Sequence, residues 1–346
     1  MGTMRQLATI QLITEVQPIP NADAIDKVRV LDWWCVSKKG EFAPGDQCVY
    51  FEIDSLLPSS HPAFSFLAKG SREVTIALEN GGTASGYRLK TVRLRGQISQ
   101  GLALPVEMFA LGFGVGSDVS ELIGIHKWEP PISKQMAAIA RGPFPAFIPK
   151  TDEERVQNLG DTVRRHAGEV FYVTEKLDGS SATFYRTDER FGVCSRNLDL
   201  LEGNLYWNVA KAEGMEDKIQ SGYAVQGEII GESIQGNPLK RKGQRFYAFN
   251  VYSIVDGRFL DFVEFRTFCA GAGIDTVPIV DSSLSLPAEA SQIVEMADGN
   301  SLLTPDADRE GLVFRPRAET YEEMRGERRR LSFKAISNRY LLKGNR

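Results

Sequence analysis

The chain has 346 residues, of which 42% are apolar and 25% are charged, and its formal net charge is −4. This length is typical of two domains, and the composition is that of an ordinary soluble globular protein that can bury sizeable cores. The charge balance excludes an overall attraction to nucleic acid, so any such binding must come from local basic patches.

The cysteines and histidines do not predict a zinc site. Four cysteines are scattered without a Cys-x-x-Cys pair, and only three histidines accompany them. Scattered cysteines of this kind are typical of reduced thiols in a cytosolic protein. Because the sequence has no signal-peptide core and no apolar run long enough to span a bilayer, we expect an intracellular protein without a membrane segment.

The N-terminal third predicts a small β-barrel or sandwich. Stretches rich in β-branched and aromatic residues alternate with turn signals, and residues 61–67 are expected to form a short helix. The expected strands cover residues 7–16, 27–33, 47–53 and 87–94, with turn signals at residues 18–23, 44–46 and 80–82.

Three basic residues, Lys90, Arg93 and Arg95, are expected on the last of these strands, where they can meet phosphate groups. Because residues two apart share a face of a strand, Arg93 and Arg95 lie together and Lys90 lies opposite. A solvated strand face explains the same residues without any ligand.

Two separated motifs in this third carry a resemblance. Residues 20–26, followed by a strand, and residues 94–102 look like the oligonucleotide/oligosaccharide-binding (OB) barrels of tRNA-binding modules. They are similar in particular to the barrel of the phenylalanyl-tRNA synthetase beta subunit. The resemblance implies an OB-like nucleic-acid-binding domain over residues 1–127.

A proline-rich stretch follows. Prolines are dense over residues 128–150 and disfavour regular structure, so this stretch is interpreted as the linker between domains. The second domain then covers residues 151–346. We expect a helix over residues 151–159, capped by Thr151 with acidic residues in its first turn. Beyond it strands alternate with helices, the clearest helices being residues 201–211 and 286–296.

A lysine lies between two strand-like stretches of the second domain. Residues 170–173 and 182–185 flank the segment that contains Glu175, Lys176, Asp178 and Gly179. The amine of an unperturbed lysine has a pKa of about 10.4, so it is a poor nucleophile at neutral pH unless burial or a neighbouring cation favours its neutral form. Taken alone, Lys-x-Asp-Gly is more typical of a solvated hairpin turn than of a reactive lysine.

Five further features follow in the same domain: Arg196 at a strand end, Glu228 inside an apolar strand, Phe249 in an aromatic strand, Glu310 opening an apolar strand, and Lys334 in a strand centre. A buried glutamate needs a partner such as a metal ion, a ribose hydroxyl or a lysine. Each feature alone has a bland explanation, such as a surface arginine, a core phenylalanine or a lysine at a sheet edge. Their combination in one domain is difficult to explain by packing.

The order and the sequences of these motifs over residues 170–336 resemble those of the covalent nucleotidyltransferases. This superfamily comprises RNA ligases, DNA ligases and messenger-RNA capping guanylyltransferases. An OB-like module placed before the transferase domain is similar to the ATP-dependent RNA ligases with an N-terminal OB domain. These seal nicks with RNA on the 3′-OH side. The resemblance implies an α+β fold in which antiparallel sheets are flanked by helices.

One departure from the family pattern is Ser332, which stands where many ligases have a second lysine. Arg328–Arg330 or Lys343 are candidate replacements for that lysine.

The resemblance implies a site that forms a lysine–AMP intermediate from ATP with Mg²⁺ or Mn²⁺. Its partner is a nicked duplex with RNA at the 3′-OH end, and the protein is expected to act as a monomer in RNA repair. A capping-type guanylyltransferase and a non-catalytic RNA-binding OB protein are the alternatives. The implied residues are Lys176, Asp178, Glu310 and Lys334 for catalysis; Glu175, Gly179, Arg196, Glu228, Phe249 and Lys334 for the nucleotide; Glu228 and Glu310 for the metal; and Arg93, Arg95, Lys240, Arg241, Lys242, Arg329 and Arg330 for nucleic acid.

Overall fold

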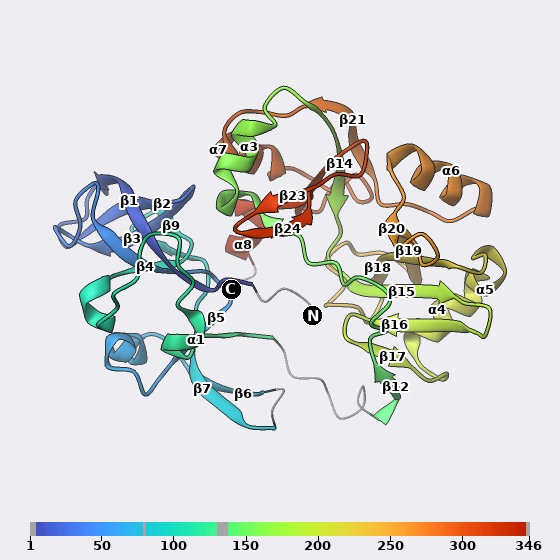
Figure 1. Cartoon of the computed structure of the whole chain (residues 1–346), viewed down its shortest axis with the longest axis horizontal. Helices are drawn as coiled ribbons and strands as arrows, with labels where there is room; N and C mark the ends of the chain where they lie inside the picture. Colours follow the sequence, from blue (N-terminus) through green and yellow to red (C-terminus); the bar gives the residue numbers. More distant parts are fainter. Residues whose placement is uncertain (1–4, 79–80, 130–137, 344–346) are drawn as a thin grey trace. The chain divides into compact units, whose positions relative to one another are not determined.

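The computed structural model describes residues 5–78, 81–129 and 138–343, and the chain divides into two compact units, residues 1–132 and Ser133–Lys343 (Figure 1). Parts of the predicted turn at residues 80–82 and of the predicted linker at residues 128–150 lie outside the described residues. Among the described residues, no helix is both long and apolar enough to cross a membrane.

The first unit is built from two curled antiparallel sheets and a short hairpin. Alternating burial along its strands gives each sheet one apolar face, and these faces enclose two adjoining clusters of buried side chains. Within the described residues the sheet orders are β10-β4-β1-β2-β3 (Leu102–Pro105, Gln47–Phe51, Ala8–Pro18, Ile25–Val30, Trp33–Lys38) and β11-β5-β7-β6 (His126–Lys127, Ser55–Pro58, Thr83–Arg88, Glu73–Ala77), with the hairpin β8-β9 (Val92–Leu94, Gln97–Ser99).

Strand β1 explains the curl of the first sheet. Its first half pairs with β4, and after an irregularity between Ile13 and Glu15 its second half pairs with β2. A bulge of this kind bends a strand, so the two halves of β1 run in different directions and the sheet curls. The short helix expected at residues 61–67 is present as the 3-10 helix η1 (Pro62–Lys69), and it buries Phe64 in the core. The short elements η2 (Val106–Phe109) and α1 (Ser120–Ile123) complete this unit.

The predicted strand over residues 87–94 was wrong. The chain leaves β7 at Arg88 and re-enters a separate strand, β8, so Lys90 lies between strands. Arg93 lies on β8, but Arg95 has a φ of 49° and begins the turn into β9. The left-handed backbone at Arg95 breaks the two-residue period, so Arg93 and Arg95 do not share a strand face.

The second unit contains a seven-stranded sheet and a five-stranded sheet. Helices α4, α5 and α6 (Leu205–Ala212, Met215–Lys218, Phe262–Ala272) pack on the first, and α3 and α7 (Gly160–Arg165, Ala290–Ala297) pack on the second (Figure 1). Among the described residues the sheet orders are β12-β17-β16-β15-β18-β19-β20 (Ala140–Pro143, Leu198–Leu200, Phe191–Ser195, Ser180–Arg186, Tyr223–Gly231, Gln244–Ser253, Arg258–Phe259) and β13-β25-β22-β14-β21 (Glu154–Arg155, Phe333–Ile336, Gly311–Pro316, Val170–Lys176, Ile279–Ser285), with the hairpin β23-β24 (Tyr321–Met324, Glu327–Arg330).

The helix predicted over residues 151–159 is absent from this described segment. Residues 154–155 instead form β13, which pairs in parallel with β25, and the 3-10 helix η3 (Val156–Asn158) follows. Pairing with the edge of a sheet has overridden the acidic first-turn signal. Helix α4 begins later than predicted, at Leu205, because the side chain of Asn204 accepts hydrogen bonds from the backbone of Tyr206 and Trp207.

The proline-rich stretch is more ordered than expected. Residues 140–143 form β12, which pairs with β17 at the outer edge of the seven-stranded sheet. An edge strand tolerates proline because one side of its backbone needs no partner in the ladder. Ile148 is buried beside Tyr185, so this part of the predicted linker packs on the second unit.

Candidate active site

The segment around Lys176 connects the two sheets of the second unit. Strand β14 of the five-stranded sheet ends at Lys176, and strand β15 of the seven-stranded sheet begins at Ser180. The two strands do not pair with each other in the described structure, so the segment is not the hairpin turn that the motif alone allows. The lysine therefore lies where two sheets meet.

Strand pairing brings Glu310 to the lysine. Lys176 is opposite Gly311 in the ladder between β14 and β22, so the preceding Glu310 lies beside it. The Nζ atom of Lys176 donates to both carboxylate oxygens of Glu310, at 2.6 and 2.7 Å. Both side chains are largely shielded from solvent.

Gly179 brings Glu228 to the same place. A Cβ atom at Gly179 would lie 2.3 Å from the carbonyl oxygen of Ile229 and 3.0 Å from the Cγ atom of Glu228. Only glycine permits this close approach of the segment to strand β18. The glycine was predicted to admit a nucleotide, and the structure gives it a role in packing against β18.

The electrostatics of Lys176 differ from the expectation of a neutral amine. Burial favours the neutral form, but Glu310, Glu228 and Asp178 outweigh it and raise the pKa of Lys176. Negative neighbours stabilise the ammonium ion, so the lysine is charged in the unliganded protein. A reaction at this amine requires these carboxylates to be withdrawn or neutralised.

Three carboxylates crowd around the lysine and oppose one another's ionisation. The pKa of Glu228 is raised to about 8, mainly by burial; Glu310 and Asp178 contribute to the rise, and Lys176 opposes it. Burial and Glu310 also raise the pKa of Asp178, against the hydrogen bond from Tyr340 and the charge of Lys176. Such a cluster of oxygen donors favours the arrival of positive charge.

The carboxylates around Lys176 fit a hard divalent cation as two of its ligands, but they do not form a complete coordination shell. Within the described ranges, no three Asp, Glu, His or Cys side chains are arranged to hold a metal by themselves. Mg²⁺ and Mn²⁺ commonly use one or two carboxylates and take their other ligands from water and phosphate oxygens. Glu228 and Glu310 fit that role, whereas a cage made entirely of protein ligands is not present in the described part.

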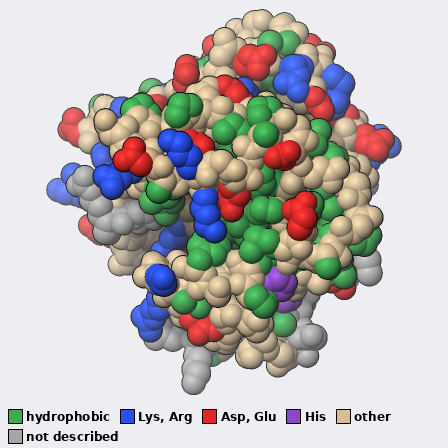
Figure 2. Space-filling view, turned by 90° about the vertical axis from the view of Figure 1, so that its left-hand side faces the viewer, with side chains coloured by type: hydrophobic (Ala, Val, Ile, Leu, Met, Phe, Trp, Pro, Cys, Tyr) green, Lys and Arg blue, Asp and Glu red, His purple; other side chains and the backbone are tan. Residues whose placement is uncertain are grey.

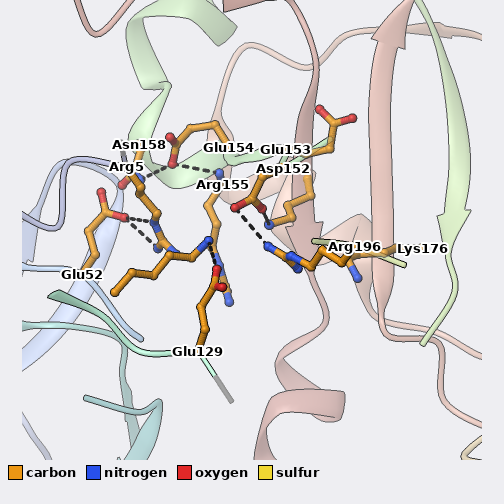
Figure 3. Close-up of polar contacts among 12 residues, drawn as sticks. Arg5, Glu52, Glu129, Asp152, Glu153, Glu154, Arg155, Asn158, Lys176 and Arg196 are labelled. Carbon is orange, nitrogen blue, oxygen red and sulfur yellow. Dashed lines mark hydrogen bonds and ion pairs between the residues drawn. The ribbon is translucent and has the colours of Figure 1, made fainter. Parts of the chain in front are cut away.

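Lys334 lies on the same face as Lys176. Lys334 is opposite Val313, which is opposite Thr174, two residues before the lysine on β14. The Nζ atom of Lys334 donates to Asp152 Oδ1 at 3.2 Å, and the Nη2 atom of Arg196 approaches Asp152 Oδ2 at 3.4 Å. Asp152 and Arg196 point toward each other in Figure 3. One carboxylate therefore bridges the two cations that were predicted to meet phosphates.

Glu175 points the other way. Alternation along β14 places its side chain on the face that packs in the core, and it is 2% exposed. Its Oε2 atom accepts a hydrogen bond from the backbone of Leu302 at 2.7 Å. Burial raises the pKa of Glu175, against Ser301 and Leu302. The side chain thus holds the segment at residues 301–302.

Phe249 lies at an irregularity of strand β19. Gln226 is opposite Asn250 and Gly227 is opposite Ala248, so Phe249 is the extra residue of a bulge. Bulges redirect side chains. Phe249 packs in a cluster with Leu177, the residue that follows the lysine.

Arg315 lies next to the position of the missing second lysine. Its Nε atom donates to Ser332 Oγ at 3.0 Å, its Nη2 atom to Glu153 at 2.7 Å, and its Nη1 atom approaches the carbonyl oxygen of Phe249 at 3.4 Å. Among the candidate replacements, Lys343 pairs with Asp308, whereas Arg330 lies close to Arg315. The Nη1 atom of Arg330 donates to Asn250 at 2.9 Å, and against the effect of burial its charge helps Arg315 to lower the pKa of Glu153. The cation that contacts Ser332 is Arg315, which the sequence did not single out.

The residues predicted to contact nucleic acid have different surroundings. Arg93, Arg95, Lys240 and Lys242 are exposed, whereas Arg241 donates to the carbonyl oxygen of Leu303 at 3.2 Å. Figure 2 shows basic side chains on one face scattered among acidic and apolar ones. The other two predicted contacts lie in ion pairs: Arg329 with Glu154 and Glu327, and Arg330 with Glu319.

Sequence reasoning missed four residues near the site: Asp152, Arg315, Tyr206 and Tyr340. Tyr206 of α4 hydrogen-bonds Ser180 and lies near Glu228. Tyr340 hydrogen-bonds Asp178. Asp152, Tyr206 and Tyr340 reach the site through tertiary packing, so no local motif marks them. Arg315 follows Glu310 by five residues, on β22, and only its contacts with Ser332 and Glu153 place it at the site.

The comparisons with known proteins agree with this arrangement. An OB-fold domain model matches residues 7–106, and an RNA ligase model matches residues 169–336. Among solved structures, an apo mutant of Naegleria gruberi RNA ligase is 44% identical, covers 100% of both chains and has a TM-score of 0.87. The same ligase with PPi is 44% identical over 99% of this chain and 100% of that one, with a TM-score of 0.86. A mutant with ATP and Mn is 44% identical over 97% and 98%, with a TM-score of 0.85.

A search of the curated proteins gave no significant match. The solved structures nevertheless confirm the expected fold, an OB-like unit followed by an α+β unit rich in antiparallel strands. They also confirm the resemblance on which the expected activity class rests, because the identity extends over nearly the whole chain. The chain belongs to the RNA ligase family, and it is an enzyme of that class.

Proposed function

We propose that this RNA ligase uses ATP to seal 3′-OH/5′-phosphate nicks, with RNA on the 3′-OH side, in intracellular RNA repair. The chemistry passes through an AMP bound covalently to Lys176. The observation that carries the proposal is the placement of Lys176 between the carboxylates of Glu310, Glu228 and Asp178, on the sheet face that it shares with Lys334. The related ligase structures are named as holding ATP, AMP, PPi and Mn, which supports this choice of nucleotide.

In the first step the Nζ atom of Lys176 attacks the α-phosphorus of ATP. A P–N bond forms, the bond to pyrophosphate breaks, and the nitrogen releases two of its three protons to solvent, one before the attack and one after it. The ion pair with Glu310 must open beforehand, because an ammonium ion has no lone pair to donate. Lys334 then exchanges Asp152 for α-phosphate oxygens and neutralises their charge.

Glu228 and Glu310 would hold the divalent ion, directly or through water. When bound, Mg²⁺ or Mn²⁺ supplies positive charge that neutralises both the phosphates and the carboxylates around the lysine. The residues of the chain orient the reacting groups and exclude water. Asp178 orients the lysine segment, and the exclusion of water around Leu177 strengthens each of these interactions.

The adenine is proposed to stack on Phe249, which the bulge in β19 redirects. Arg196 reaches the ribose or the acceptor phosphate. The side chain of Glu175 points into the core, so we propose that it shapes the nucleotide site through the segment at residues 301–302 that it holds.

In the second step the AMP moves from Lys176 to a 5′-phosphate, which gives a 5′–5′ pyrophosphate linkage. In the third step a 3′-hydroxyl attacks that phosphate, the phosphodiester forms and AMP leaves. We propose that the polynucleotide is held by Arg93, Arg95, Lys240 and Lys242, which are exposed. Arg241, Arg329 and Arg330 would join them after exchange of their present partners.

We propose a nucleic-acid-binding domain at residues 1–127, a linker at residues 128–150 and an adenylyltransferase domain at residues 151–346, acting as a monomer. A separately expressed second domain would then form the lysine adduct but seal nicks poorly. Nick sealing by the second domain alone at the rate of the full chain would show that sealing does not require the first domain.

The proposed function is tested with four nicked duplexes that carry RNA or DNA on each side of the nick. Sealing is expected with ATP, only where the 3′-OH strand ends in RNA, and not with Lys176→Ala. Equal sealing of an all-DNA nick would overturn the strand preference. Label transfer from GTP but not ATP would favour a capping-type guanylyltransferase, and RNA binding without any adduct would favour a non-catalytic protein.

A further inference from the structure

Tyr340 lies on the helix α8 (Asn338–Lys343), which follows strand β25 and closes the described part of the chain. Its hydroxyl donates a hydrogen bond to Asp178 Oδ2, across 162 residues of sequence. Burial and this hydrogen bond raise the pKa of Tyr340, so the phenol keeps its proton and acts as a donor. The bond directly joins the last described helix to the segment that carries Lys176.

The helix is anchored at both ends, so Tyr340 has a fixed position. Ser337, just before the helix, donates to Asp298 at 2.7 Å and accepts from the backbone of Tyr340 at 3.2 Å. On the exposed side, Arg339 and Lys343 both form ion pairs with Asp308. A single carboxylate with two cations one helical turn apart restrains the helix against rotation.

The contacts that hold α8 also reach the segment of Glu310, which is another carboxylate beside Lys176. Asp308 is two residues before Glu310, and the backbone of Ser337 donates to the carbonyl oxygen of Glu310 at 2.9 Å. The helix therefore contacts Asp178 through Tyr340 and the Glu310 segment through Ser337 and Asp308. Both carboxylates influence the charge on Lys176.

We propose that Tyr340 is a positioning residue for lysine adenylation: its hydroxyl fixes the Asp178 carboxylate beside Lys176 while α8 fixes the Glu310 segment. This inference rests on the proposed lysine–AMP chemistry. The hydrogen bond ties Asp178 to a helix that is itself anchored, so the side chain cannot turn away. Tyr340 thereby holds the segment that carries Lys176 in one position.

The test compares Tyr340→Phe with the wild type in the rate of adduct formation from Mn²⁺ and increasing ATP, measured by intact mass. Removing an outer partner of a site of this type commonly costs about 10- to 100-fold in activity. The loss is expected in the rate at saturating ATP and not in the ATP concentration that gives half the maximal rate, because the hydroxyl acts on the lysine segment. Binding of ATP and the melting temperature are expected to stay unchanged.

Two further variants separate positioning from general stability. Asp308→Asn keeps Tyr340 but loosens the helix, and it is expected to slow adduct formation at saturating ATP to a smaller extent. Tyr321→Phe removes a phenol of an exposed residue on β23 and is expected to match the wild type. A Tyr340→Phe rate within twofold of wild type at saturating ATP, or a loss that saturating ATP removes, would overturn the inference. A wild-type protein that forms no adduct would reject the proposed function instead.

Discussion

The ammonium group of Lys176 donates hydrogen bonds to both carboxylate oxygens of Glu310, at 2.6 and 2.7 Å. This pair holds the lysine in place and also keeps it protonated, since Glu310 contributes most to raising its pKa against the effect of burial. The unliganded site is therefore oriented but unreactive. Nucleotide and divalent ion together must separate the pair before the amine can attack phosphorus.

Glu310→Gln is expected to lower the pKa of Lys176 because the strongest opposing charge is lost while burial remains. Labelling of Lys176 by an amine-reactive acetylating agent, followed by peptide mass spectrometry, should then extend to lower pH than in the wild type. Adduct formation from ATP is expected to fall by at least about 100-fold, as when one electrostatic contributor is removed from an active site. A labelling profile identical to that of the wild type would show that Glu310 does not control the charge on the lysine.

Glu228 predicts a pH-dependent change in stability. Burial raises its pKa to about 8, so the folded state binds this proton more tightly than the unfolded state does. Stability is therefore lost as pH rises from the ordinary glutamate pKa of about 4.3 toward 8. Glu228→Gln should match the wild-type melting temperature at acidic pH and exceed it at alkaline pH, by about 2–4 °C for each kcal/mol of relieved cost. An equal difference at both pH values would contradict this interpretation.

Asp152 competes with phosphate for two cations. It bridges Lys334 at 3.2 Å and Arg196 at 3.4 Å, and its side chain is 42% exposed. Exposed pairs contribute up to about 1 kcal/mol, so Asp152→Asn is expected to tighten ATP binding by up to about fivefold. Binding should be measured calorimetrically in a Lys176→Ala background, with Asp161→Asn as a control at an exposed ion pair. Weaker binding by Asp152→Asn would indicate that this carboxylate assists the nucleotide.

His166 connects helix α3 to the β23-β24 hairpin. Burial disfavours its charge, but hydrogen bonds to Glu322 and Glu169, both at 2.8 Å, outweigh it and raise its pKa. A histidine with a raised pKa stabilises the fold below its unfolded pKa of about 6.5, and the benefit is lost as pH rises through the folded value. His166→Gln should therefore cost about 1 kcal/mol at mildly acidic pH and little at alkaline pH, by thermal denaturation. A larger cost at alkaline pH would contradict the assignment.

The sequence predicts those parts of the site that lie on recognisable strands. Glu310 and Lys334 reach the site through the ladder of β14, β22 and β25, and the motif order anticipates that they gather with Lys176. Asp152 and Tyr340 could not be predicted, because neither belongs to a motif and only the folded chain brings Asp152 to Lys334 and Arg196 and brings Tyr340 to Asp178. Pairing at the sheet edge also decided the structure of residues 154–155 against their local helix signal.

The charge on Lys176 was mispredicted for a similar reason. Sequence identifies the lysine and its carboxylates, but only three-dimensional distances show whether burial or opposite charge dominates. The orientation of Glu175, by contrast, could be predicted from the sequence. The two-residue period of a strand already places it on the face away from Lys176, and its contact with Leu302 agrees.

Lysine adenylation is tested most directly by intact mass spectrometry after incubation with ATP and Mn²⁺, followed by peptide mapping. The account predicts a single AMP adduct on Lys176 that is absent from Lys176→Ala and is released by added pyrophosphate. An unmodified wild-type protein, or an adduct that maps to Lys334 or another side chain, would contradict it.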